Sequence, residues 1–125
     1  VLVRILLDTR VLIWWDEGAR LHQEAKRAIR AADQVYVSAV TGWEIAIKAS
    51  LGKIRARRTV SDAIEDSGFE ELPVFLRPAA ALSSLPMHHR DPFDRMLVAQ
   101  AKADRLTIVT RDAALKAYRV PLIAA

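Results

Sequence analysis

A chain of 125 residues, 52% of them hydrophobic and 27% charged, has the size and composition of one folded domain, which we expect to span residues 1–125. Nineteen Lys and Arg against fifteen Asp and Glu give a net charge of +4, which favours an anionic partner without identifying one. The absence of cysteine excludes disulfides, thiolate metal sites and a cysteine nucleophile, and no apolar run reaches the ~18 residues of a membrane span, so we expect a cytoplasmic protein that does not enter a membrane.

The first half of the chain alternates strand and helix patterns. Val1–Leu7 is apolar except for Arg4 and predicts a buried strand, and Val35–Val37 predicts a second one. Apolar residues at helical spacing, with glycines at the ends, indicate helices between and after these strands. The expected helices are Thr9–Trp15, Leu21–Ala32, one that Ser38 or Thr41 caps and that runs to about Leu51, and Val60–Ser67.

The second half continues this alternation. Asp91-Pro92 is a strong helix start, because proline suits the first helical position. The expected elements are a strand at Glu71–Val74, a helix at Pro78–Leu85, a loop at Pro86–Arg90, a helix from Asp91 to about Asp104, a strand at Leu106–Val109, a short helix at Ala113–Tyr118 and an edge strand at Pro121–Ala125. Strands that are apolar on both faces predict a three-layer α/β domain with a central parallel sheet, which binds ligands at the carboxyl ends of its strands.

Four acids follow these strands or open the helices beside them. Asp8 and Asp112 come after strands, and Glu44 and Asp94 lie in the early turns of helices that could face the same sheet edge. Carboxylates ~4 Å apart repel by roughly 4 kcal/mol at an effective dielectric of 20, so their convergence calls for a cation. All-oxygen ligands favour Mg²⁺ or Mn²⁺ over zinc. Such ions can activate a water and stabilise the leaving oxygen in phosphodiester cleavage.

Each acid also has a purely structural explanation. Asp8 and Asp112 could cap the helices that follow them. Thr41 and Glu44 match a capping box, and Glu44 is also spaced for an i,i+4 ion pair with Lys48. Asp94 lies near a helix N-terminus, where the helix dipole stabilises a negative charge. Singly these explanations are the commoner ones, whereas four acids at one predicted edge favour a site.

Four sequence blocks stand in order along nearly the whole chain. They are Leu6–Thr9 with Trp14-Trp15, Ser38–Thr41 with Trp43–Lys48, Arg90–Ala101, and Val109–Asp112. Together they resemble the PIN-domain nucleases, in particular the VapC-type toxins of bacterial toxin–antitoxin pairs. The resemblance implies a parallel-sheet α/β fold and a metal-dependent endoribonuclease that hydrolyses RNA. It also implies homodimers and a cognate antitoxin that fills the active-site groove.

The resemblance assigns roles to individual residues. It implies that Mg²⁺ or Mn²⁺ is held by the acids Asp8, Glu44, Asp94 and Asp112. Asp91 is left as a helix cap or a residue behind the ligands. The chain departs from the family at Arg10, where close relatives usually have histidine. This arginine could contact phosphate, or it could compete for a carboxylate and leave a PIN-like scaffold that binds RNA or an antitoxin without cleavage.

Other residues near the blocks have two readings each. The hydroxyls of Thr9 and Thr110 could orient a water or serve as helix caps. Arg95 and Arg111 could meet the scissile phosphate or lie solvated at the surface. His88 and His89 precede the third block, and we expect them in a loop near the substrate rather than on a metal. The three tryptophans could stack bases or receive antitoxin side chains, with at least one of them in the core; they are Trp14, Trp15 and Trp43.

Overall fold

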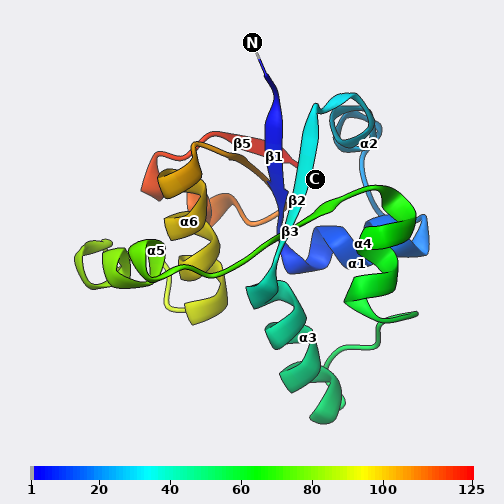
Figure 1. Ribbon diagram of the computed structural model, residues 1–125, viewed down its shortest axis with the longest axis horizontal. Coiled ribbons are helices and arrows are strands. Elements are labelled where there is room, and N and C mark those ends of the chain that lie inside the picture. The colour runs from blue at the N-terminus through cyan, green and yellow to red at the C-terminus, as the bar shows by residue number, and fades with distance from the viewer. Residues whose placement is uncertain (1) are drawn as a thin grey trace.

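A five-stranded parallel sheet organises residues 2–125, which are the residues that the computed structural model describes (Figure 1). The strand order is β3-β2-β1-β4-β5, and every neighbouring pair is parallel. The strands are β1 (Arg4–Leu7), β2 (Gln34–Ser38), β3 (Glu70–Leu72), β4 (Thr107–Thr110) and β5 (Leu122–Ala124). The parallel order places the carboxyl ends of β1, β2 and β4 side by side at one edge. The predicted α/β architecture is therefore confirmed.

Helices cover both faces of the sheet. The α-helices are α1 (Thr9–Glu17), α2 (Gln23–Ala31), α3 (Ala39–Ser50), α4 (Val60–Ser67), α5 (Leu76–Ala81) and α6 (Pro92–Asp104), and two 3-10 helices are η1 (Leu82–Ser84) and η2 (Ala113–Tyr118). In Figure 1, α1, α2 and α4 lie on one side of the strands, and α5 and α6 lie on the other. In residues 2–125 no helix is long and apolar enough to cross a membrane.

The alternation of side chains along β1 divides the core between these two layers. Ile5 and Leu7 belong to the cluster formed with α1, α2 and α4, whereas Leu6 belongs to the cluster formed with α6 and η2. All three side chains are fully buried. Because β1 is filled on both faces and paired on both edges, the residue that follows it is held rigidly.

The observed elements differ from the predicted ones at a few ends. The helix predicted at Pro78–Leu85 begins earlier, at Leu76, and continues after Ala81 as the 3-10 helix η1. The short helix before β5 is also of the 3-10 type, and β3 ends at Leu72 rather than at Val74. Val1, which the first predicted strand included, lies outside the described residues.

The start of α3 corrects one prediction with a bearing on the site. Ser38, the last residue of β2, caps α3 by accepting a 3.0 Å hydrogen bond from the backbone N–H of Val40. Thr41 therefore lies inside the helix, where its side chain is fully buried. The capping box predicted for Thr41 and Glu44 is wrong, because the cap is formed three residues earlier.

Candidate active site

A cavity of about 300 Å³ lies at the carboxyl ends of the central strands. It is lined by all four predicted acids together with Asp91, three cations, one threonine and one tryptophan: Asp8, Glu44, Asp94, Asp112, Asp91, Arg10, Lys48, Arg111, Thr9 and Trp14. The topology that places β1, β2 and β4 side by side thus brings together acids that are up to 104 residues apart in the chain.

Asp8 is the most rigidly held of these acids. One carboxylate oxygen, Oδ1, caps α1 by accepting from the backbone N–H of Val11 at 2.8 Å, and Oδ2 accepts from the hydroxyl of Thr110 at 2.5 Å. The same hydroxyl oxygen accepts from the backbone N–H of Asp112 at 3.0 Å. Burial raises the pKa of Asp8, as do Glu44 and Asp112, while the two hydrogen bonds oppose this rise. Asp8 therefore caps α1, as predicted, and also lines the cavity with the other acids.

Glu44 is held from both sides. Oε1 accepts a 2.5 Å hydrogen bond from the hydroxyl of Thr9, which lies 3.3 Å from the hydroxyl of Thr41. Oε2 forms the predicted ion pair with Lys48, at 2.5 Å. Glu44 is 6% exposed, so the lysine provides a counter-charge to a buried carboxylate. Thr9 is buried and acts here by orienting Glu44.

Asp94 lines the cavity from the N-terminus of α6. It lies in the first turn of α6, which Asp91 caps through hydrogen bonds from the backbone N–H groups of Phe93 and Asp94. Burial raises the pKa of Asp94 to about 7, with further contributions from Asp91, Asp8 and Glu44, and His89 partly offsets them. A carboxyl group that shares a cavity with other acids resists ionisation unless a cation joins them.

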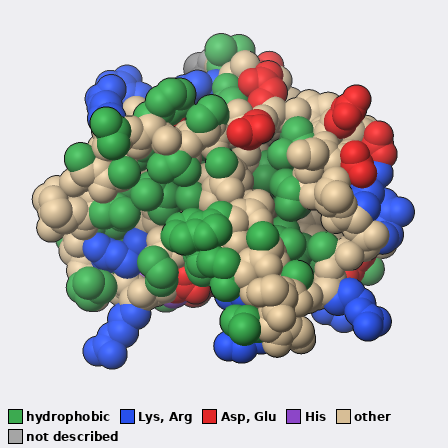
Figure 2. All heavy atoms as spheres, turned by 60° about the horizontal axis from the view of Figure 1, so that its bottom comes forward, with side chains coloured by type: hydrophobic (Ala, Val, Ile, Leu, Met, Phe, Trp, Pro, Cys, Tyr) green, Lys and Arg blue, Asp and Glu red, His purple; other side chains and the backbone are tan. Residues whose placement is uncertain are grey.

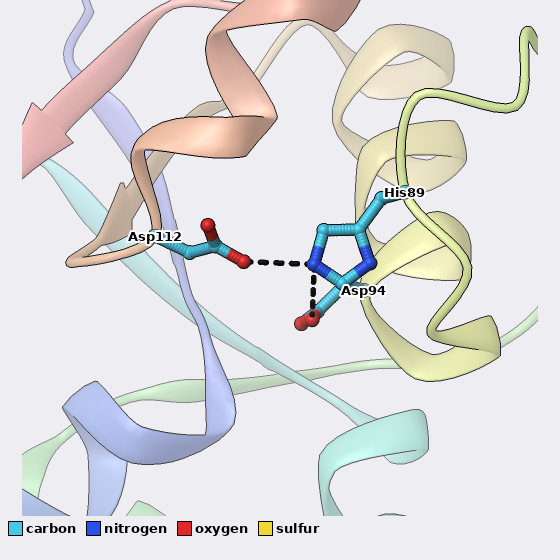
Figure 3. A group of neighbouring side chains, drawn as sticks. All are labelled: His89, Asp94 and Asp112. Carbon is cyan, nitrogen blue, oxygen red and sulfur yellow. Dashed lines mark hydrogen bonds and ion pairs between the residues drawn. The ribbon is translucent and has the colours of Figure 1, made fainter.

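Asp112 lies at the start of η2 and faces His89 (Figure 3). Its Oδ1 accepts from the backbone N–H of Ala114 at 3.0 Å, and its Oδ2 lies 2.8 Å from Nε2 of His89. The same Nε2 lies 3.5 Å from Oδ2 of Asp94. Figure 3 shows the imidazole reaching from the loop before α6 into the space between the two carboxylates. One ligand atom from each of these three residues lies within 4.8 Å of the other two.

The hydrogen bond at the other ring nitrogen fixes the role of His89. The backbone N–H of Asp91 donates to Nδ1 at 3.0 Å, so Nδ1 is an acceptor and the ring proton is on Nε2. His89 therefore donates to Asp112 and has no lone pair for a metal at Nε2. Sequence reasoning placed this histidine near the substrate but did not connect it to the acids. Its position two residues before a helix cap is the signal that could have revealed the contact with Asp91.

Arg95 lies away from the cavity. Its guanidinium donates to the carbonyls of Pro86 (2.8 Å), Leu82 and Leu85 (both 3.2 Å) and to the hydroxyl of Tyr118 (3.2 Å). Tyr118 in turn accepts a 2.8 Å bond from the backbone N–H of His89. The phosphate contact considered for Arg95 does not fit this buried position, because its donors hold the loop that carries His89.

Arg10 and Arg111 both line the cavity. Arg111 lies over the ring of Trp14, 4.2 Å from its centroid, and donates to the backbone carbonyls of Arg20 and Ala125. The guanidinium is thus already engaged by the turn after α1 and by the residue that follows β5. Arg10 is exposed and, within residues 2–125, forms no ion pair with any acid, so it does not occupy the place between the carboxylates.

Comparison with known proteins places this geometry in a family. The PIN domain profile matches residues 5–121. Ribonuclease VapC22 of Mycobacterium tuberculosis is 30% identical over 121 residues, which cover 94% of this chain and 93% of that protein. Among solved structures, VapBC2 from Rickettsia felis bound to a promoter DNA fragment superposes with a TM-score of 0.72 at 12% identity, covering 98% of both chains. A toxin–antitoxin complex from Klebsiella pneumoniae gives 0.67 at 22% identity, covering 96% of both.

Proposed function

Because the chain belongs to the PIN-domain family, we propose that it is an endoribonuclease dependent on Mg²⁺ or Mn²⁺ and acts as the toxin of a toxin–antitoxin pair. The observation that carries this proposal is the single cavity lined by Asp8, Glu44, Asp94 and Asp112. The name of the Mycobacterium tuberculosis relative, a ribonuclease, supports RNA as the substrate.

The donor set suits a divalent cation. The four acids offer oxygen atoms, which Mg²⁺ and Mn²⁺ prefer, and the raised pKa values of Asp8 and Asp94 mark negative charge that the protein compensates incompletely. We assign the four carboxylates as the residues that would hold the ion. When bound, such an ion lowers the pKa of a water and stabilises charge on the leaving oxygen of a phosphodiester.

The remaining polar residues of the site hold these acids in place. Thr110 fixes Asp8, Thr9 and Lys48 fix Glu44, and His89 fixes Asp112. Each hydrogen bond orients a carboxylate before substrate binds, which reduces the reorganisation that the reaction requires. The reaction uses water as nucleophile, so no side chain needs to form a covalent intermediate.

Cations at the rim suit the phosphates of a substrate. Arg10, Lys48 and Arg111 line the same cavity as the acids, and Arg10 is exposed with no acidic partner in residues 2–125. We assign Arg10 to the RNA backbone.

The alternative function is a scaffold that binds RNA or an antitoxin without cleaving RNA. It depended on Arg10 competing with the metal for a carboxylate. Arg10 forms no such ion pair in the described residues, so this alternative has no support from the structure.

The test is cleavage of a mixed structured RNA by the purified, partner-free protein, with Mn²⁺ and with EDTA. We expect cleavage with Mn²⁺ that stops in EDTA and in the Asp94→Asn variant. Asp62 is the matched control, because it occupies the same position in α4 that Asp94 occupies in α6. Asp62→Asn should cleave like the unchanged protein. A folded Asp94→Asn variant that cleaves at full rate would contradict the proposal.

An exposed apolar surface supports protein partners. Figure 2 shows hydrophobic side chains gathered on the face that carries α3 and α5. Large exposed side chains here include Trp43 in α3, Leu76 at the start of α5 and Phe75 just before it. Such a surface is typical of protein interfaces. We propose that the cognate antitoxin and a second copy of the chain bind here. Light scattering of the free protein tests the dimer, and co-purification with a co-expressed antitoxin tests the complex.

A further inference from the structure

A second hollow lies next to the acidic cavity and shares Trp14 with it. Its volume is about 140 Å³. It is lined by the end of α1, the turn after it and one face of α2, through Trp14, Trp15, Gly18, Leu21, Lys26 and Arg30. The acidic cavity and this hollow thus border the same indole ring.

The two tryptophans of this hollow have different roles. Both are partly buried and pack against the core on this side of the sheet. The ring of Trp15 also packs against Phe69 with centroids 5.6 Å apart, and its Nε1 donates to Ser67 at 3.1 Å. Trp14 is half-buried and carries Arg111 over its ring. Arg111 lines the acidic cavity but not the hollow, whereas Trp14 lines both. An aromatic surface of this kind can stack a nucleobase.

The side of the hollow that α2 forms is basic. Lys26 and Arg30 are four residues apart on α2 and therefore lie on one face of the helix. Within residues 2–125 neither of them forms an ion pair with an acid, and Arg30 lies 5.8 Å from the ring of Trp15. The charge here is opposite to that of the acidic cavity, where a cation would be needed. A phosphate group can bind Lys26 and Arg30 directly, with no metal ion between them.

We propose that the hollow is a subsite for one nucleotide of a single-stranded RNA, next to the phosphate that lies in the acidic cavity. The base stacks on Trp14, and the phosphate of that nucleotide binds Lys26 and Arg30. The volume is below the ~300 Å³ at which whole-ligand pockets begin, so it accommodates one base rather than a longer segment. This assignment rests on the proposed function, because RNA is the ligand that would join both cavities.

Binding measured without cleavage tests the subsite separately from the nuclease activity. The probe is a fluorescently labelled single-stranded RNA of mixed sequence, titrated in EDTA and followed by anisotropy at several salt concentrations. Lys26→Gln and Arg30→Gln should each lower the slope of log K against log salt by about 0.7, the loss expected for one phosphate contact to a single strand. Arg27→Gln is the matched control, because Arg27 is exposed on α2 but does not line the hollow. It should leave the slope unchanged.

Stacking is tested at Trp14. Trp14→Leu should weaken RNA binding by about tenfold or more, and Trp14→Phe should restore part of it, because the smaller ring still stacks. A set of oligonucleotides, each with its abasic site at a different position, should be titrated against both proteins. At one position the missing base should abolish the difference in affinity between the unchanged protein and Trp14→Leu, because the base that stacks on Trp14 is then absent. Thermal melting of each variant establishes that it is folded.

The outcomes separate the two proposals. Equal salt slopes for Lys26→Gln and Arg27→Gln, or no RNA binding at all, would overturn the subsite even if the protein cleaves RNA with Mn²⁺. Trp14- and Lys26-dependent binding without any cleavage would support the subsite and contradict the nuclease. An acidic peptide that binds with this dependence while RNA does not would assign the hollow to a protein partner and overturn the proposal.

Discussion

Nε2 of His89 donates to Oδ2 of Asp112 across 2.8 Å, and the backbone N–H of Asp91, which donates to the other ring nitrogen, selects the tautomer that makes this bond. Removing the imidazole leaves Oδ2 of Asp112 without this donor, and only Oδ1 keeps its bond from the backbone N–H of Ala114. We expect His89→Ala to lower cleavage activity and Mn²⁺ affinity by about 10- to 100-fold, the range for residues that support metal ligands. His89→Gln should retain part of both, because its amide can place an N–H near the position of Nε2.

The control for this prediction is His88, whose ring packs edge-on against Tyr118 and does not line the cavity. His88→Ala should change Mn²⁺ affinity little. If His89→Ala and His88→Ala were equal in Mn²⁺ affinity, the interaction with Asp112 would have no part in holding the acids.

The raised pKa of Asp94 predicts how the stability of the metal-free protein depends on pH. Its value of about 7 in the folded state compares with 3.8 ordinarily. Between these values the folded protein retains a proton that the unfolded chain has released, so stability falls as pH rises through this window. Asp94→Asn removes this dependence. In EDTA at pH 8 the variant should melt a few degrees higher than the unchanged protein.

Metal should reverse that difference. Mn²⁺ at pH 8 should raise the melting temperature of the unchanged protein through binding to the folded state, and should raise that of Asp94→Asn much less. Asp62→Asn, at the equivalent place in α4, should follow the unchanged protein in both conditions. Parallel melting curves for Asp94→Asn and the unchanged protein across pH 4 to 8 would show that Asp94 ionises normally.

The sequence was sufficient for those parts of the site that depend on strands and helix starts. Asp8 and Asp112 follow strands whose apolar runs are unambiguous, and parallel pairing alone brings the ends of β1 and β4 together. Asp94 was predictable because Asp91-Pro92 is a strong helix start, which places it in the first turn. In each case a local pattern and one rule of sheet topology determine the position.

The parts that the sequence left open depend on the path of a loop. His89 reaches Asp112, and Arg95 turns inward, because residues 82–90 fold back over η2 and bring their carbonyls to the guanidinium. No periodic pattern encodes such a path. The capping box at Thr41 failed for a related reason: Ser38 already caps α3, and the packing of α1 against α3 brings Thr41 to Thr9.

Arg95 should matter for stability and for the position of His89. Replacing it with methionine leaves three loop carbonyls and the hydroxyl of Tyr118 without their shared donor. We expect a loss of about 2 kcal/mol or more in the free energy of unfolding. Lysine should not restore it, since one ammonium cannot reproduce the planar set of donors.

Hydrogen exchange gives the more specific result for Arg95. Amides of residues 85–91 should exchange faster in Arg95→Met, because the loop loses its anchor. Arg77→Met is the control, since Arg77 is exposed on α5 and forms none of these bonds. If the loop amides exchanged at the same rate in both variants, Arg95 would not be what holds His89 in place.

Thr110 links two of the acids through one hydroxyl, which donates to Asp8 and accepts from the backbone of Asp112. Thr110→Val preserves the shape of the side chain but leaves both groups without that partner. The hydrogen bond from Thr110 lowers the pKa of Asp8, so its loss raises that pKa further. Mn²⁺ binding should therefore weaken by about tenfold or more, and the deficit should grow as pH falls, because Asp8 must be ionised to bind. Thr110→Ser keeps the hydroxyl and should bind Mn²⁺ nearly normally. If the loss of Mn²⁺ affinity in Thr110→Val did not depend on pH, the hydroxyl would act only on the backbone of Asp112.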